Sequence, residues 1–214
     1  LRTARIEEEL SLAHQIQQTF LQSDFPELPR CTVHAVNLPS RQVGGDYYDV
    51  VPAPDGSFLV AIADVAGKGV PAALLSSMLQ AALRTQARSV ESPATILRNI
   101  NALVYRSTAV HQFATFFLAR VSADGNRMAY ANAGHNPPIW LHGVKQTMKS
   151  LMRTGAALGI IEDLPMEDRT ITLERNDFLL LYTDGLTEAF SPEGETYGEE
   201  RLQQVLESTE VATV

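Results

Sequence analysis

Apolar residues along the chain follow two different periods, and each period predicts a different kind of element. In residues 3–22 they recur every three or four positions, which places them on one side of an α-helix. The residues on that side are Ile6, Leu10, Ala13, Ile16 and Phe20. Pro26 and Pro29 follow and do not continue a helix. We therefore expect an amphipathic helix that packs on its own domain, or else joins an upstream domain or a second copy.

The rest of the chain shows strand-like runs separated by turn residues. Pro54-Asp55-Gly56 and Asp124-Gly125 predict hairpins. Helical patterns run over residues 71–88 and 93–107, with Ser92 as N-cap, and a last helix begins near Glu199. The expected strands are 32–37, 47–51, 58–64, 114–121, 128–132, 138–141, 170–173 and 178–182. Strands grouped around hairpins, with two central helices, indicate an antiparallel α+β domain.

Composition narrows the function classes. The 214 residues include 45% hydrophobic ones, enough for a core of ordinary size. The net charge of −8 disfavours nucleic acid or an anionic membrane as the main partner. The single cysteine, Cys31, excludes an internal disulfide and fits a reducing cytoplasm. We expect no membrane span, because the apolar runs are short.

The stretch FLVAIADVAGKGVP, residues 58–71, contains a Gly-Lys-Gly that invites comparison with a nucleotide-binding loop. The nucleotide template needs a glycine five positions before Gly67, where this chain has Ile62, and a hydroxyl residue after Lys68, where it has Gly69. The feature of interest is therefore Asp64, which ends the apolar run.

An aspartate stands at each of three places where a strand pattern breaks at a glycine: Asp46 in GGD (44–46), Asp64 in IADVAG (62–67) and Asp184 in LLLYTDG (179–185). Carboxylates brought close together repel one another unless a cation lies among them. Oxygen ligands without a histidine pattern suit Mg²⁺ or Mn²⁺. Two such ions can activate a water for in-line displacement at phosphorus, which agrees with the absence of a recognisable Ser-His-Asp or Cys-His set.

Several segments together resemble the SpoIIE/RsbU-type serine phosphatases, which belong to the metal-dependent (PPM, type 2C-like) protein phosphatases. The resemblance extends over almost the whole chain and includes the leading helix ELSLAHQIQQTFL. The matching segments are VGGDYYDV (43–50), ADVAGKGVPAAL (63–74), ANAGHNPP (131–138), LYTDGLTEA (181–189) and YGEERL (197–202).

The resemblance implies a four-layer α-β-β-α sandwich of two antiparallel sheets with two Mn²⁺ or Mg²⁺ ions at one end. It implies that Asp64 bridges both metals, that the backbone carbonyl of Val65 is a ligand, that Asp46 contacts the second metal and that Asp184 binds the first. Gly45, Gly67 and Gly185 occupy the glycine positions beside these ligands.

Three further residues are candidates for binding substrate. Arg41 precedes Asp46 at an offset similar to that of a phosphate-binding arginine in type 2C enzymes, and otherwise is a surface arginine. His135 is either a general acid or a turn histidine bonded to the backbone. Lys68 either draws an anionic substrate or is simply the exposed residue of a Gly-x-Gly turn.

The resemblance also predicts domain organisation and partners. We expect residues 1–24 to be a regulatory linker helix that connects an upstream sensor or receiver domain to this domain or forms a homodimer. We expect residues 25–214 to be the phosphatase domain. The expected function is hydrolysis of phosphoserine or phosphothreonine on an anti-anti-sigma (STAS-like) protein in the cytoplasm of a bacterium. The resemblance implies that this reaction is part of a partner-switching circuit that regulates sigma factors.

The two ends of the sequence lead to an expectation about its completeness. The chain begins at Leu1 rather than Met and ends at Val214, near the last predicted helix. We expect it to be excised from a longer protein and to lack the family's last strand with its Asp-Asp-x-Thr motif, which puts the activity of this chain in doubt. The alternatives are a catalytically silent interaction domain that binds the phosphoprotein or a regulator, and a nucleotide-binding regulator.

Overall fold

The computed structural model divides the chain into two compact units, which are described separately. The first unit contains Leu1–His135 and Arg153–Thr172, and the second contains Asn136–Met152 and Leu173–Val214. The residues that the structure describes are 2–20, 25–28, 30–38, 43–108, 112–143 and 147–208.

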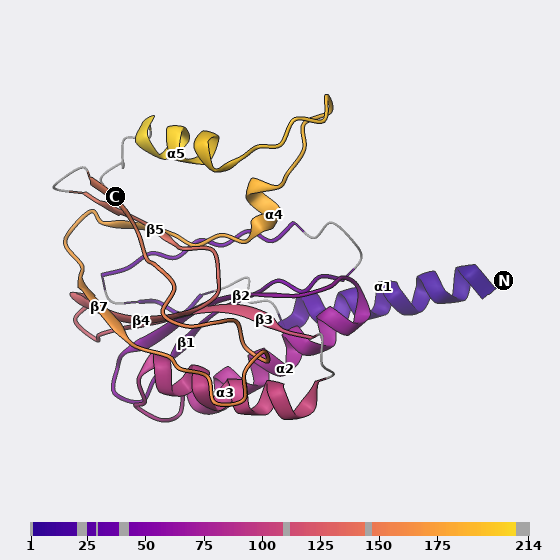
Figure 1. Ribbon diagram of the computed structural model, residues 1–214, viewed down its shortest axis with the longest axis horizontal. Coiled ribbons are helices and arrows are strands. Elements are labelled where there is room, and N and C mark those ends of the chain that lie inside the picture. Colours follow the sequence, from indigo (N-terminus) through magenta and orange to yellow (C-terminus); the bar gives the residue numbers. More distant parts are fainter. Residues whose placement is uncertain are drawn as a thin grey trace. The chain divides into compact units, whose positions relative to one another are not determined.

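A five-stranded antiparallel sheet forms the centre of the first unit (Figure 1). The order is β1-β2-β3-β4-β7, so four strands follow chain order and the fifth joins the edge. The hairpin between β1 and β2 is the one that Pro54-Asp55-Gly56 predicts, and Asp124-Gly125 lies between β3 and β4. The strands are β1 (Tyr47–Pro52), β2 (Phe58–Val65), β3 (Ala114–Val121), β4 (Arg127–Ala133) and β7 (Arg169–Thr172).

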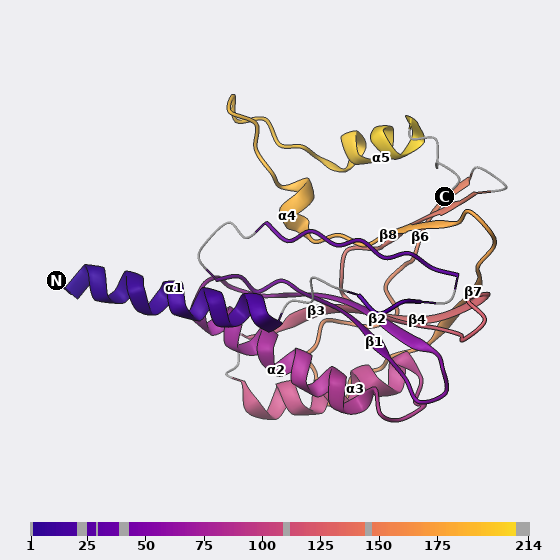
Figure 2. The same ribbon diagram turned by 180° about the vertical axis from the view of Figure 1, so that it is seen from behind.

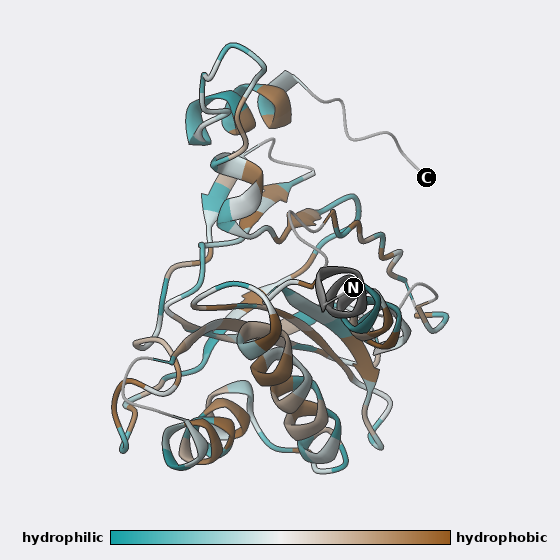
Figure 3. Cartoon of the chain, turned by 90° about the vertical axis from the view of Figure 1, so that its right-hand side faces the viewer, coloured by the Kyte–Doolittle hydropathy of each residue, from teal (hydrophilic) through white to brown (hydrophobic). Residues whose placement is uncertain are grey.

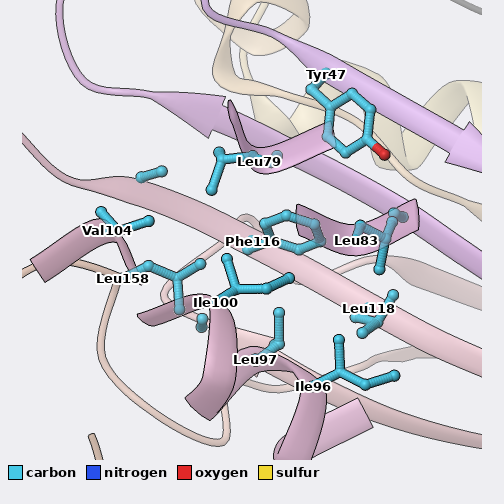
Figure 4. Packing of buried hydrophobic residues seen from close by; sticks show 14 of the residues in the cluster. Tyr47, Leu79, Leu83, Ile96, Leu97, Ile100, Val104, Phe116, Leu118 and Leu158 are labelled. Atoms are coloured by element: carbon cyan, nitrogen blue, oxygen red, sulfur yellow. The ribbon is translucent and has the colours of Figure 1, made fainter. Parts of the chain in front are cut away.

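Helices α2 (Val70–Gln86) and α3 (Pro93–Ser107) cover one face of this sheet, as the reverse view in Figure 2 also shows. Figure 3 shows hydrophobic positions gathered along α2 and on one side of α3. Ser92 caps α3 by accepting a hydrogen bond from Thr95 N–H at 3.3 Å. The core between helices and sheet is almost solvent-free, with Leu79, Ile96 and Phe116 at 0% exposure (Figure 4).

Helix α1 (Arg2–Phe20) corresponds to the expected N-terminal helix, but its contacts differ from the predicted apolar side. Ile16, which the spacing places on that side, is 49% exposed, and Leu12 is 57% exposed. The residue that is buried is polar: Gln17 is only 9% exposed because its amide bonds the backbone of Gly44. The side chains of Ile6, Leu10 and Phe20 lie outside the described residues.

The second unit contains a three-stranded antiparallel sheet in the order β6-β5-β8. Its small core joins Ile139 and Tyr182 to Leu202 and Leu206 of the last helix. Asp177 accepts hydrogen bonds from Trp140 Nε1 and from two backbone N–H groups. The elements are β5 (Ile139–His142), β6 (Thr147–Ser150), β8 (Phe178–Leu180), α4 (Asp184–Thr187) and α5 (Glu199–Ser208).

The α+β class with two antiparallel sheets is confirmed, and most elements agree with the prediction to within a few residues. The expected strand over residues 32–37 is wrong: this segment forms no strand within the described residues, because its β-branched pattern finds no backbone partner there. Two elements were not predicted from the sequence. Strand β6 has the polar sequence TMKS, and α4 is only four residues long. None of the described helices has both the length and the apolar character needed to cross a bilayer.

Candidate metal centre

The register of β1 on β2 brings two of the predicted ligands together. Tyr47 pairs with Ala63 at the end of the antiparallel ladder, and Asp46 and Asp64 are the next residues on the two chain segments. If the register continues by one step, we expect Asp46 to lie opposite Asp64. Opposite residues on neighbouring strands share a face, with Cβ atoms about 4.5–5.5 Å apart. Both aspartates are half-buried. Two carboxylates in this relationship repel each other, and a cation near both would remove that repulsion.

Strand alternation decides which face of the sheet these carboxylates occupy. Tyr47 and Ala63 belong to the core under α2 and α3. Because successive side chains point to opposite faces, Asp46 and Asp64 lie on the face away from these helices. Asp49 shares the face of Tyr47 instead. It is 1% exposed and accepts two hydrogen bonds from Arg84 of α2, at 2.8 and 3.2 Å.

Asp49 is therefore a structural residue, although it stands in the same motif as Asp46. Tyr47 donates its phenolic hydrogen bond to Asp49 at 3.0 Å. Burial and the neighbouring Asp49 charge raise the pKa of Tyr47 well above its usual range, because both disfavour the phenolate. Sequence reasoning missed this group, although the alternation of Tyr47, Asp49 and Val51 was visible in the pattern.

The carbonyl of Val65 lies in a cradle that only a glycine leaves open. A β-carbon at Gly45 would stand 2.9 Å from Val65 O and 3.3 Å from Ala72 Cβ. The loop before Asp46 thus lies against the end of β2 and the first turn of α2. Gly67 and Gly69 have φ of 104° and 79°, the left-handed region that lets the chain turn sharply from β2 into α2.

A second chain segment reaches the same end of the sheet through Thr115, which pairs with Asp64 across β2 and β3. The Thr115 hydroxyl lies 3.4 Å from Asp64 O and 2.8 Å from Nδ1 of His135. His135 is fully buried, and its backbone N–H donates to Asn132 Oδ1 at 2.8 Å. The turn that holds His135 is therefore fixed from two sides. Sequence reasoning did not find Thr115 or Asn132.

Three further residues were predicted for the site. Lys68 is exposed in the turn between β2 and α2. Asp184 is the first residue of α4 in the second unit, where its side chain is exposed and its carbonyl accepts from Glu188 N–H. Arg41 lies outside the described residues.

The donor set at the end of β2 fits a hard divalent cation. Two carboxylates and a backbone carbonyl are oxygen donors, and the glycine cradle lets the backbone approach closely. Within the described ranges there is no group of three or more His, Cys, Asp or Glu side chains placed to hold a metal ion. Among these residues, Asp46 and Asp64 are the two carboxylates next to the paired ends of β1 and β2.

Comparison with known proteins agrees with this fold. The model of the family described as Stage II sporulation protein E (SpoIIE) matches residues 54–214. Phosphoserine phosphatase RsbU of Bacillus subtilis is 34% identical over 189 residues, which is 88% of this chain and 56% of the relative. The chain thus spans little more than half the length of that relative.

Two solved structures share the fold. The SiaA-PP2C domain of Pseudomonas aeruginosa has a TM-score of 0.78 at 24% identity, over 100% of this chain and 86% of that one. A structure of RsbX in complex with magnesium has a TM-score of 0.59 at 18% identity, over 83% of this chain and 87% of that one. These likenesses establish a PP2C-like fold.

The fold therefore defines a PP2C-like domain. The chain belongs to the SpoIIE family, as the match over residues 54–214 shows.

Proposed function

We propose that the chain is the catalytic domain of a metal-dependent phosphatase that removes phosphate from serine or threonine of a regulatory protein. The observation that carries this proposal is that the β1–β2 ladder ends at Tyr47 and Ala63, the residues next to Asp46 and Asp64, beside the close approach of Gly45 to the Val65 carbonyl. This arrangement brings several oxygen donors to one end of the sheet. The phosphoserine phosphatase RsbU, at 34% identity, supports the activity.

The proposed ligands in the first unit are Asp46, Asp64 and the Val65 carbonyl, and Asp184 stays a predicted ligand from the family resemblance. Two Mn²⁺ or Mg²⁺ ions, when bound, would supply a water of lowered pKa and positive charge for the phosphoryl oxygens. Asp46 and Asp64 would hold the ions, and the buried core beneath β1 and β2 keeps the backbone of these strands in place. The RsbX structure with magnesium supports a divalent cation in this fold.

Substrate contacts are proposed for the residues around this centre. Lys68 is exposed in the turn that follows Asp64, where its charge would attract an anionic phosphoprotein. Arg41 stays a prediction for phosphate binding. The complete burial of His135 favours a role in holding Thr115 beside Asp64 over direct contact with substrate.

The proposed setting is a bacterial partner-switching pathway in the cytoplasm. The substrate would be a phosphorylated anti-anti-sigma (STAS-like) protein. Residues 1–24 would connect the phosphatase domain, residues 25–214, to a sensor or receiver domain, or would pair with a second copy. The relationship to RsbU supports this assignment.

Hydrolysis of p-nitrophenyl phosphate tests the proposal. We expect turnover that requires Mn²⁺ or Mg²⁺, is abolished by EDTA and is lost in Asp64→Asn. Activity that ignores EDTA would contradict the metal mechanism. No turnover on any phosphoprotein would favour the silent interaction domain.

A further inference from the structure

Gln17 of α1 makes a two-point contact with one residue of the loop that leads to Asp46. Its Nε2 donates to Gly44 O at 2.7 Å, and Gly44 N–H donates to Gln17 Oε1 at 3.1 Å. The two residues are 27 positions apart in sequence. The side-chain amide therefore satisfies both backbone groups of Gly44, as a neighbouring strand would.

The loop that Gln17 holds is short and, by composition, flexible. Gly44 and Gly45 are adjacent, and two successive glycines allow far more backbone conformations than other residues. On the other side of the loop, Gly45 lies against Val65 O and Ala72 Cβ. The backbone that enters Asp46 is thus held between α1, the end of β2 and the first turn of α2.

From this geometry we propose that Gln17 is a positioning residue for the metal centre. By fixing Gly44 it sets the backbone that presents Asp46 opposite Asp64. The inference rests on the proposed function, because it concerns the same metal ligands. Gln17 itself touches neither metal nor substrate, and it acts through the main chain of the loop.

Packing alone does not explain a glutamine at this position. Gln17 is 9% exposed, and a leucine would fill a buried helix position without the cost of desolvating an amide. Other side chains in this part of the helix, Gln15 and Ile16 among them, are exposed. The buried amide is accounted for by the backbone groups of Gly44, which need partners once they are covered.

The test compares Gln17→Leu with Gln15→Leu, a matched change at an exposed position of the same helix. Mn²⁺ affinity is measured by titration calorimetry. We expect Gln17→Leu to weaken it about 10- to 100-fold, the range typical of partners that orient metal ligands, and Gln15→Leu to leave it unchanged. Equal affinities in wild type and Gln17→Leu would overturn the inference and leave the proposed function standing. A wild-type chain that binds no Mn²⁺ would instead remove the proposed function.

Hydrogen exchange on the metal-free wild-type chain gives a second readout that needs no variant to fold. The Gly44 amide should exchange slowly, because its N–H is bonded to Gln17 Oε1. Exchange of the Gly44 amide at the rate of an unprotected amide would contradict the contact itself. In Gln17→Leu the same amide should lose its protection.

Discussion

Gly45 lies so close to Val65 that a β-carbon at position 45 would stand 2.9 Å from the Val65 carbonyl oxygen. That oxygen is a proposed metal ligand, so the contact links the loop before Asp46 directly to the donor set. We predict that Gly45→Ala displaces the carbonyl or the loop and weakens Mn²⁺ binding about 10-fold or more, by analogy with outer-shell changes at metal sites. Titration calorimetry checks this prediction, and unchanged affinity would show that the cradle does not position a ligand.

We predict that the ion pair between Asp49 and Arg84 contributes to the stability of the fold but not to metal binding. Arg84→Ala leaves the fully buried Asp49 carboxylate without its guanidinium partner. We expect a loss of about 2–3 kcal/mol in the free energy of unfolding, below the value for a wholly buried pair because the Arg84 side chain is 48% exposed. Mn²⁺ affinity should stay within about twofold of wild type, because Asp49 faces the helices.

Urea denaturation measures the change, with Arg88→Ala as the control. Arg88 is an exposed arginine just beyond α2, and its removal should change stability by less than about 0.5 kcal/mol. If Arg84→Ala proved as mild as this control, the ion pair would contribute nothing measurable to the fold.

The raised pKa of Tyr47 predicts a loss of stability in alkaline solution. In the unfolded chain the phenol titrates near its ordinary value of about 10, whereas burial and Asp49 hold it protonated in the fold to higher pH. The contribution of the protonated Tyr47 phenol to the free energy of unfolding is therefore complete below about pH 10 and is lost as pH rises toward the folded-state pKa. Tyr47→Phe should reduce the steepness of this decline relative to wild type. A pair of unfolding curves at pH 9 and 11 measures it, and equal slopes would contradict the assignment.

The buried turn histidine yields a further prediction. His135→Ala removes the partner of the Thr115 hydroxyl and leaves a cavity, so the melting temperature should fall. If His135 acts only by holding Thr115, Thr115→Val should weaken Mn²⁺-dependent turnover to a similar degree, and neither variant should change the alkaline limb of the pH–rate profile. A general acid must be protonated to act, so loss of the alkaline limb in a folded His135 variant would instead indicate that His135 is a general acid.

Periodicity predicted most of the fold because local signals and tertiary structure agree there. Strand β3 and helix α3 have the bounds that the pattern gave, with Ser92 as the cap. The segment 32–37 has the same β-branched character yet forms no strand among the described residues, since strand formation depends on a partner that sequence does not reveal. The polar strand β6 shows the converse: pairing with β5 makes a strand of TMKS.

The candidate site was predictable only in part. Asp46 and Asp64 stood out because Asp46 precedes an apolar run and Asp64 ends one, and a glycine lies within three residues of each. Whether the two aspartates lie opposite one another depends on the register of a hairpin, which the turn residues suggest but do not fix. The contacts of Gln17 with Gly44 and of Arg84 with Asp49 join residues 27 and 35 positions apart, and no local pattern marks them.

The most direct test of the metal centre is Mn²⁺ binding to the wild-type chain, Asp46→Asn and Asp64→Asn, measured by the electron paramagnetic resonance signal of unbound Mn²⁺. Each substitution keeps the side-chain volume and removes one negative charge from the opposed pair. We predict that wild type binds Mn²⁺ and that both variants bind it more weakly. The loss in affinity should exceed the roughly 10- to 100-fold that is typical when a residue that only orients a metal ligand is changed. Binding by either variant with wild-type affinity would contradict a metal held by Asp46 and Asp64.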